Sequence, residues 1–433
     1  MINLKKWQEK NVLEAGIERL EYLFDNFKHI YFSFSGGKDS GAMIQLADQV
    51  AQRLSRTFDL LILDIEANYD STCIFIEDMK TLPSVNTCYH FCLPFYEDNT
   101  VSIFQPQWLM WNPEEKDKWV QPLPIDAIQF QDLDAQLVKL YQATYGNPDR
   151  FLRFFSYWYK HQHNQEPVVC CIGIRSQESF NRYRAIVNGK KKFYGRAWIN
   201  QYAKNVYNAY PIYDWQVEDI WGAVSKFQWK INLFYERLYK LGTPLSEMRI
   251  CQPYGLQQRK SLNQYAVIEP RTWERVVKRV SGANFGRLYS KTTLLGHYKS
   301  KKPSHMSWQE YTVFLLETIG LYSKKLQYHY YRKIKILMKY YQVNFGMEVG
   351  DIPEEATRKE WERDEKLWHN WKGIAKAIEK NDFSLSTRQY SLTKQDEKEL
   401  YELAEIFQSQ LGLENLSQQE INKLKNSGWR MWK

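Results

Sequence analysis

The stretch from His29 to Ala47, HIYFSFSGGKDSGAMIQLA, sets two glycines, a lysine and an aspartate between an apolar run and an amphipathic run. The apolar run predicts a buried strand, and the amphipathic run predicts a helix. Glycine adopts backbone angles that are closed to other residues, so the main-chain amides of such a loop can lie against a phosphate group. The positive end of the following helix points at the same place. This stretch therefore predicts an anion-binding loop inside an α/β domain.

The loop supplies six expected nucleotide-binding residues, which are Ser35, Gly36, Gly37, Lys38, Asp39 and Ser40. The serines add hydroxyl donors, and Lys38 adds a mobile cation that can follow the charge developing on a leaving pyrophosphate. Asp39 is the better candidate for a Mg²⁺ ligand or an orienting group. The loop is not a Walker A motif, because that motif requires a glycine where this chain has Phe32.

Apolar runs alternate with helical patterns along the first half of the chain and predict a doubly wound, mainly parallel five-stranded sheet. The five expected strands lie in 29–35, 58–67, 87–95, 167–175 and the start of 208–224. We expect a nucleotide-binding α/β domain over residues 1–265, with an insertion at about 96–166 because ordinary α/β connections are far shorter. Residues 266–433 carry helical patterns and predict a mainly helical C-terminal domain.

Composition favours a soluble protein without a membrane span, because no long uncharged apolar run is present. The first residues are charged throughout and lack a secretory signal, so a cytoplasmic location is expected. The six cysteines are Cys73, Cys88, Cys92, Cys170, Cys171 and Cys251. Their spacing contains no CxxC pair and no repeated ligand pair, so we expect reduced thiols, no iron–sulfur cluster and no zinc.

The formal net charge of +9 permits attraction to a polyanion. Its densest expression is Tyr330–Tyr341, YYRKIKILMKYY, where basic and aromatic residues are interleaved. Such a helix can follow a phosphate backbone and stack bases, which makes DNA or tRNA an expected partner. The alternative is a surface helix whose Ile334, Ile336 and Leu337 face a core.

The hexapeptide SGGKDS directly after an apolar strand resembles the PP-loop of the ATP pyrophosphatase superfamily. That superfamily includes ATP sulfurylase small subunits, phosphoadenosine phosphosulfate (PAPS) reductases, GMP synthetases and tRNA thiolation enzymes. The resemblance implies the adenine nucleotide α-hydrolase-like fold and ATP, or a related adenine nucleotide, with Mg²⁺. In this family the loop holds the phosphates while the α-phosphorus is attacked and pyrophosphate leaves.

Two later stretches resemble elements of ATP sulfurylase and PAPS reductase: GIRSQESFNRYR, which begins at Gly173, and YPIYDWQVEDIW, which begins at Tyr210. The resemblance implies that Arg175 and Arg182 face phosphate or sulfate oxygens, for which a planar guanidinium is well shaped. It implies that Glu178 orients these arginines or the substrate. The alternative is a surface cluster of salt bridges. The expected catalytic residues are Lys38, Asp39, Arg175 and Arg182, and the expected nucleotide-binding set includes Gly173 and Glu178.

Two carboxylates, Asp64 and Glu66, end the second expected strand at the carboxyl edge of the sheet. Ligands of doubly wound folds bind at this edge. We expect both residues in the nucleotide-binding set, either through Mg²⁺ that bridges the phosphates or through the ribose or adenine. Acidic residues also commonly cap helices, so a capping role remains open for Glu66.

The chain is most similar to the immunoglobulin-binding regulator A-type, PAPS-reductase-like group, on PLSEMRICQPYG, QRKSL and IEPRTWERVVKRVSGANFG. PAPS reductases attack sulfur with a cysteine in a C-terminal ECGxH-like motif, whereas this chain ends NSGWRMWK. A true PAPS reductase is therefore not expected.

The resemblance favours an enzyme of the ATP pyrophosphatase or adenylyltransferase type, either sulfurtransferase-like or sulfurylase-like. It would adenylylate an acceptor with release of pyrophosphate, in sulfur or sulfate transfer to a nucleic acid or a small molecule. The alternative is a nucleotide-binding regulator that works with a ParB-like partner on DNA without turnover.

Overall fold

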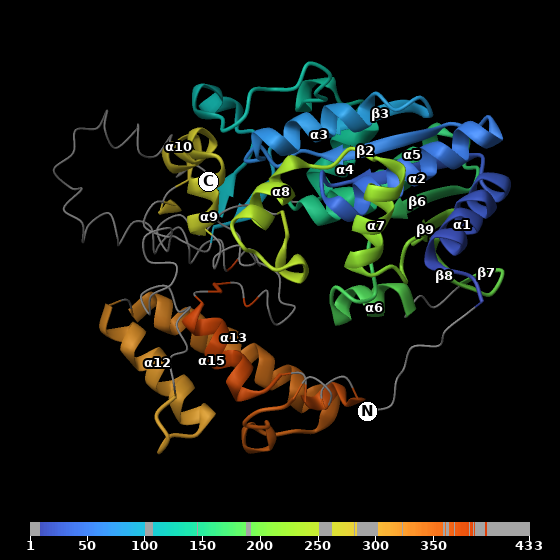
Figure 1. Ribbon diagram of the computed structural model, residues 1–433. Helices are drawn as coiled ribbons and strands as arrows, with labels where there is room; N and C mark the ends of the chain where they lie inside the picture. Colours follow the sequence, from blue (N-terminus) through green and yellow to red (C-terminus); the bar gives the residue numbers. More distant parts are fainter. Residues whose placement is uncertain are drawn as a thin grey trace. The chain divides into compact units, whose positions relative to one another are not determined.

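The computed structural model divides into two compact units, and each is described by itself (Figure 1). The described residues are 9–99, 107–144, 146–187, 192–250, 262–280, 282–283, 302–322, 324–357, 360, 363–367, 369–380, 382–383, 385 and 395. The first unit comprises Met1–Tyr96, Met110–Gln252 and Ala266–Trp273. The second comprises Glu97–Leu109, Pro253–Tyr265 and Glu274–Lys433.

A seven-stranded sheet in the order β3-β2-β1-β6-β9-β8-β7 forms the centre of the first unit. Its strands are β1 (His29–Phe34), β2 (Phe58–Leu63), β3 (Val85–Phe91), β6 (Val168–Ile172), β7 (Lys192–Phe193), β8 (Arg196–Ala203) and β9 (Val206–Ala209). The five strands expected from the sequence are all present and parallel, which confirms the α/β class. The antiparallel strands β8 and β7 extend the sheet beyond β9 and were not predicted.

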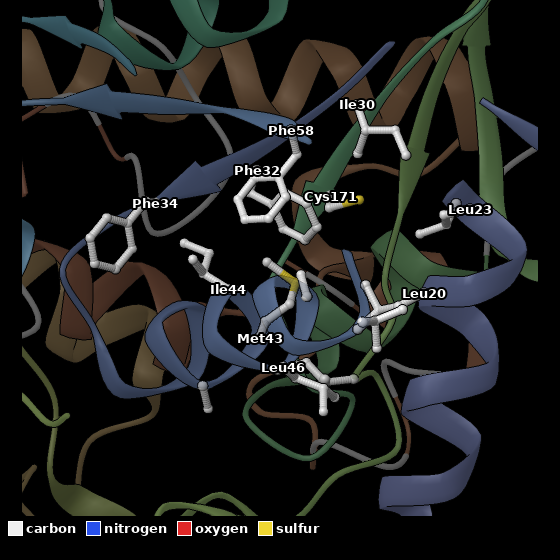
Figure 2. Packing of buried hydrophobic residues seen from close by; sticks show 14 of the residues in the cluster. Leu20, Leu23, Ile30, Phe32, Phe34, Met43, Ile44, Leu46, Phe58 and Cys171 are labelled. Carbon is white, nitrogen blue, oxygen red and sulfur yellow. The ribbon is translucent and has the colours of Figure 1, made fainter. Parts of the chain in front are cut away.

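Helices cover both faces of this sheet, as the continuous apolar strands require. On one face Phe32 packs with Phe58, Met43 and Cys171, in the core that α1 and α2 help to build (Figure 2). On the other face the preceding residue of β1, Tyr31, lies against the rings of Phe155 and Tyr159, and its hydroxyl is hydrogen-bonded to Ser156 at 2.7 Å. The helices of this unit are α1 (Val12–Asn26), α2 (Lys38–Leu54), α3 (Asp70–Lys80), α4 (Ala135–Ala143), α5 (Pro148–Gln162), α6 (Phe180–Val187), α7 (Val217–Phe227) and α8 (Leu233–Lys240).

Short elements lie in the first unit and in the segments where the chain passes between the two units. The 3₁₀ turns are η1 (Pro113–Lys118), η2 (Phe130–Asp132) and η3 (Leu245–Glu247). Strands β4 (Tyr96–Asp98) and β5 (Gln107–Leu109) form a separate two-stranded sheet. Helices α9 (Leu262–Ile268) and α10 (Pro270–Arg279) follow later in the chain.

The second unit has its own core, built by α12 (Trp308–Tyr322), α13 (Lys324–Phe345) and α15 (Trp371–Glu379). Its 3₁₀ turns are η6 (Val349–Asp351) and η7 (Glu365–Leu367). The helical C-terminal region is therefore confirmed. In α13, Ile334 and Leu337 are buried as expected, whereas Ile336 is exposed, so its predicted inward orientation is wrong. None of the helices in the described part of the chain has the length and apolar character that a membrane span requires.

Candidate functional site

The loop between β1 and α2 lies at the topological switch point of the sheet. The chain adds β2 on one side of β1 and β6 on the other. Ligands of open α/β sheets bind outside the carboxyl ends of the strands at such a point. Gly36 has a φ of +70°, and a Cβ built there would lie 2.6 Å from the Thr72 side chain. Both observations explain why glycine is required at this position.

Gly37 is the N-cap of α2 and provides no side-chain cap. The amide N–H groups of Gly36, Gly37 and Asp39 have no hydrogen-bond acceptor among the described residues. Ser35 is exposed, and its Oγ lies 3.2 Å from Oγ of the buried Ser40. The loop thus presents amide donors and hydroxyls together at the positive end of a helix, which is the arrangement that stabilises a bound anion.

Two residues beyond the expected set hold the loop in place. Asn232 donates its side-chain amide to the Gly36 carbonyl at 3.0 Å and to Thr72 Oγ1 at 2.9 Å. The Tyr235 hydroxyl accepts the Lys38 amide at 3.1 Å, and the Lys38 ammonium lies 5.3 Å from the centre of the Tyr235 ring. The sequence signals only that Asn232 caps α8, so its second role is visible only in the folded chain.

Asp39 connects the two buried cations of the site. Its Oδ1 accepts from Arg175 Nε at 2.6 Å, and its Oδ2 accepts from Lys38 Nζ at 3.2 Å. The Arg175 guanidinium also lies 4.0 Å from Glu178. Opposite charges that are this close and mostly buried fix the positions of both cations relative to the loop.

Gly173 lets the start of the GIRSQESFNRYR motif lie against the loop 35–40. A Cβ at this position would lie 2.8 Å from Cα of Ser40 and 3.0 Å from its amide nitrogen. Only glycine allows β6 to end in contact with the first turn of α2. This close approach brings Arg175, two residues later, to Asp39.

Arg182 lies in α6 and forms an ion pair with Glu178. Its side chain is 42 % exposed, whereas Arg175 is 4 % exposed. The sequence predicted the same role for both arginines, but the structure gives them different environments. Arg182 is therefore partly accessible to solvent, whereas Arg175 is buried in an ion pair with Asp39.

Asp64 and Glu66 are buried just beyond β2. Glu66 accepts hydrogen bonds from the amides of Trp111 and Val120, and Asp64 accepts from the amide of Glu66 at 2.8 Å. Asp64 also lies 3.3 Å from Nε2 of His90. These carboxylates organise the segments around the ends of β2 and β3.

The motif that begins at Tyr210 contacts α1 through side-chain hydrogen bonds. Asp214 forms two hydrogen bonds with Arg19 of α1, at 2.7 and 2.6 Å, and the Trp215 indole donates to the Val12 carbonyl at 2.9 Å. The Ser176 amide donates to the Tyr213 carbonyl at 2.8 Å, so this motif supports the turn that follows Arg175.

The loop, the N-terminus of α2 and the arginine form an anion-binding arrangement of the PP-loop kind, and the sequence relationships are consistent with this class. Residues 29–243 match the phosphoadenosine phosphosulfate reductase domain, and residues 242–369 match a domain of unknown function, DUF3440. Residues 29–243 are thus similar to PAPS reductase domains.

The chain belongs to the same family as the uncharacterized protein YbdN of Escherichia coli strain K12. The two are 33 % identical over 403 residues, which is 90 % of this chain and 93 % of YbdN. Solved structures similar to this chain include the PAPS reductase of Candida auris in a phosphate complex, with 9 % identity, a TM-score of 0.29, and coverage of 55 % of this chain and 94 % of that one. Another is the U34-tRNA thiolase NcsA of Methanococcus maripaludis with its [4Fe-4S] cluster, with 11 % identity, a TM-score of 0.27, and coverage of 64 % and 83 %.

Proposed function

We propose that this protein binds ATP or a related adenine nucleotide at the loop 35–40 and cleaves it at the α-phosphate, adenylylating an acceptor with release of pyrophosphate. The observation that carries the proposal is the set of loop amides that have no acceptor within the described part of the chain, next to the Asp39-linked pair of Lys38 and Arg175. The match of residues 29–243 to the PAPS reductase domain supports the same class of ligand.

Each group has a distinct task in this proposal. The amides of Gly36 and Gly37 hold the departing pyrophosphate, and Lys38 stabilises the negative charge that develops on it. Arg175 faces the phosphate next to the reacting bond, where a rigid guanidinium matches two oxygens. Arg182 completes the charge compensation from its exposed position, and Glu178 orients both arginines.

Magnesium is expected to accompany the nucleotide. Both oxygens of Asp39 accept from cations in this arrangement, so the carboxylate does not fit a Mg²⁺ ion as a further partner. Asp39 is assigned as a positioning residue for Lys38 and Arg175, and no step is assigned to the metal ion.

The acceptor in this proposal is a nucleic acid or a small molecule, and sulfur or sulfate transfer is the expected purpose. Sulfonucleotide reduction is not proposed, because the sequence has no ECGxH-like segment and Cys251 is its last cysteine.

A second candidate is a nucleotide-binding regulator that acts on DNA with a ParB-like partner, without turnover. Helix α13 favours it, because its 22 residues contain no Asp or Glu while Lys335, Lys339 and Tyr340 are exposed. A basic helix with exposed aromatic side chains suits a phosphate backbone and unstacked bases.

Pyrophosphate release from ATP and Mg²⁺ tests the two candidates, first with the protein alone and then with DNA, total tRNA or sulfate. Stimulation by one addition identifies the acceptor class and supports the enzyme. ATP binding by calorimetry without pyrophosphate under any condition supports the regulator. The Lys38→Ala variant is the control, because unchanged binding and turnover in that variant would refute the assignment of the loop.

A further inference from the structure

Three side chains with different ligand atoms converge where β2 and β3 end. Asp64 follows β2, while His90 lies in β3 and Cys92 directly follows it. They are 4 %, 1 % and 3 % exposed, respectively, and their oxygen, nitrogen and sulfur atoms all lie within 4.8 Å of one another. We propose that Asp64, His90 and Cys92 bind a zinc ion.

The distances fit the coordination of zinc. Asp64 Oδ2 and His90 Nε2 are 3.3 Å apart, which is longer than a charge-assisted hydrogen bond of about 2.7–2.9 Å. Zinc bonds of about 2.0–2.2 Å to nitrogen and oxygen place two ligands of a tetrahedron roughly 3.3 Å apart. The sulfur of Cys92 lies within 4.8 Å of both other ligand atoms, and it would bind at a bond length of about 2.3 Å.

Two charged side chains contact Nδ1 of the His90 imidazole, while Nε2 faces Asp64. His90 Nδ1 lies 3.4 Å from Oδ1 of Asp126 and 3.2 Å from the Lys80 ammonium, which also contacts that carboxylate at 2.6 Å. A histidine that donates Nδ1–H to a carboxylate presents the lone pair of Nε2 to a metal, and this partner is typical of zinc-binding histidines. Zinc binding at Nε2 therefore requires the Lys80 ammonium to leave Nδ1 and to keep only its contact with Asp126.

The backbone also holds the ligands in position. Asp64 Oδ1 accepts the Glu66 amide at 2.8 Å, and the Cys92 amide donates to the Ile128 carbonyl at 3.0 Å. The Trp111 indole donates to the Asp64 carbonyl at 3.0 Å. These contacts tie the two strand ends to the segment 111–128, and a bound ion would cross-link the end of β2 to the end of β3.

The mixture of donors selects the ion. Thiolate and imidazole suit zinc, whereas magnesium and calcium take oxygen ligands. Burial raises the pKa of the Cys92 thiol, and the carboxylates of Asp64 and Asp126 raise it further. A cation at the site would reverse this environment and stabilise the thiolate. Three protein ligands leave a fourth position for water or for the nearby thiol of Cys73.

The test measures zinc in the purified full-length protein by mass spectrometry and titrates the metal-depleted protein with Zn²⁺ and Co²⁺. About one zinc ion per chain is expected, with a thiolate-to-cobalt charge-transfer band after Co²⁺ binding. Cys92→Ser should lose the band, and His90→Gln should lose the zinc. Cys88→Ser, which changes a half-buried thiol two residues before His90, should keep both.

Binding that is unchanged in Cys92→Ser, or no zinc uptake by the natural chain, would overturn the proposal. Asp126→Asn tests the zinc site even if the variants at buried positions fail to fold. The Asp126 side chain is 44 % exposed, so this variant is expected to fold. This change should weaken zinc binding by about 10- to 100-fold in competition with a chelator. Unweakened binding would contradict the site. None of these readouts depends on ATP, so their failure is separate from failure of the proposed function.

Discussion

Two neighbouring parts of the same sheet edge differ in the charge that they are built to bind. Beyond β1 and β6, loop amides lie beside Lys38 and Arg175, an arrangement suited to an anion. Beyond β2 and β3, a carboxylate, an imidazole and a thiol converge as cation ligands. The strands pair in parallel in both places, so the sheet supplies a position and the residues after each strand decide the ligand.

The two sites also differ in how their residues are distributed along the chain. Six residues of the anion site are consecutive, from Ser35 to Ser40, so the local sequence shows them as one motif. The ligands of the cation site come from two strands, and Asp126 comes from a third segment. Substitutions that affect one site and spare the other test whether the comparison is correct.

The largest effect is expected from Arg175→Ala, because it leaves Asp39 as a buried carboxylate that has lost its closest cation. Removal of one partner from a buried ion pair costs about 3–5 kcal/mol in the free energy of unfolding. Urea denaturation measures this cost, and pyrophosphate release should also be lost. Arg182→Ala is the matched control and should cost less than about 1 kcal/mol, because Arg182 is half-exposed. Equal costs for the two arginines would contradict the different environments described here.

Lys38→Ala should weaken ATP binding by about 10- to 100-fold, since a hydrogen bond to a charged group contributes about 1.5–3 kcal/mol. Calorimetry measures the affinity. The zinc content of this variant should equal that of the natural chain. The reverse experiment uses Cys92→Ser, which should bind ATP normally while zinc is lost. Loss of both ligands in either variant would mean that the two strand ends form one site.

Gly173→Ala should destabilise the fold by about 1–3 kcal/mol, because the added carbon meets the backbone of Ser40 at 2.8 Å. It should also weaken ATP binding by separating β6 from the loop. Gly222→Ala provides the control, since no atom lies within 4 Å of its added Cβ and it lies in the interior of α7. This control should gain about 0.5–1 kcal/mol of helix stability. A similar loss in both variants would argue against the close approach.

The smallest effect is expected from Glu166→Gln, at the opposite edge of the sheet. A hydrogen bond from His29 at 2.7 Å and the charge of Lys28 lower the pKa of Glu166. A lowered pKa adds stability above the unfolded value of about 4.3 and loses it as the pH falls through the folded value. The difference in stability from the natural chain should therefore be present at neutral pH and vanish in acid, with ATP and zinc binding unchanged. A difference that persists in strong acid would contradict this origin.

Much of the fold and of the anion site could be predicted from local patterns. The five parallel strands are continuous apolar runs, and Gly36 and Lys38 stand in one short motif. The pattern of β8 is less clear, because its first residues are exposed and its buried residues are consecutive rather than alternating. Tyr235 and Asn232 were not predicted, since their contacts with the loop span 197 and 196 residues.

The sequence by itself determined the α/β class, the loop with its glycines and charged residues, and membership in a family. Periodicity and the backbone angles open to glycine depend on residues that are close together in the sequence. Only the tertiary structure decided that Asp39 holds Arg175, and that Asp64 meets His90 and Cys92. These contacts depend on strand order and register, since parallel pairing places the ends of separate strands side by side. No spacing within one segment contains that information.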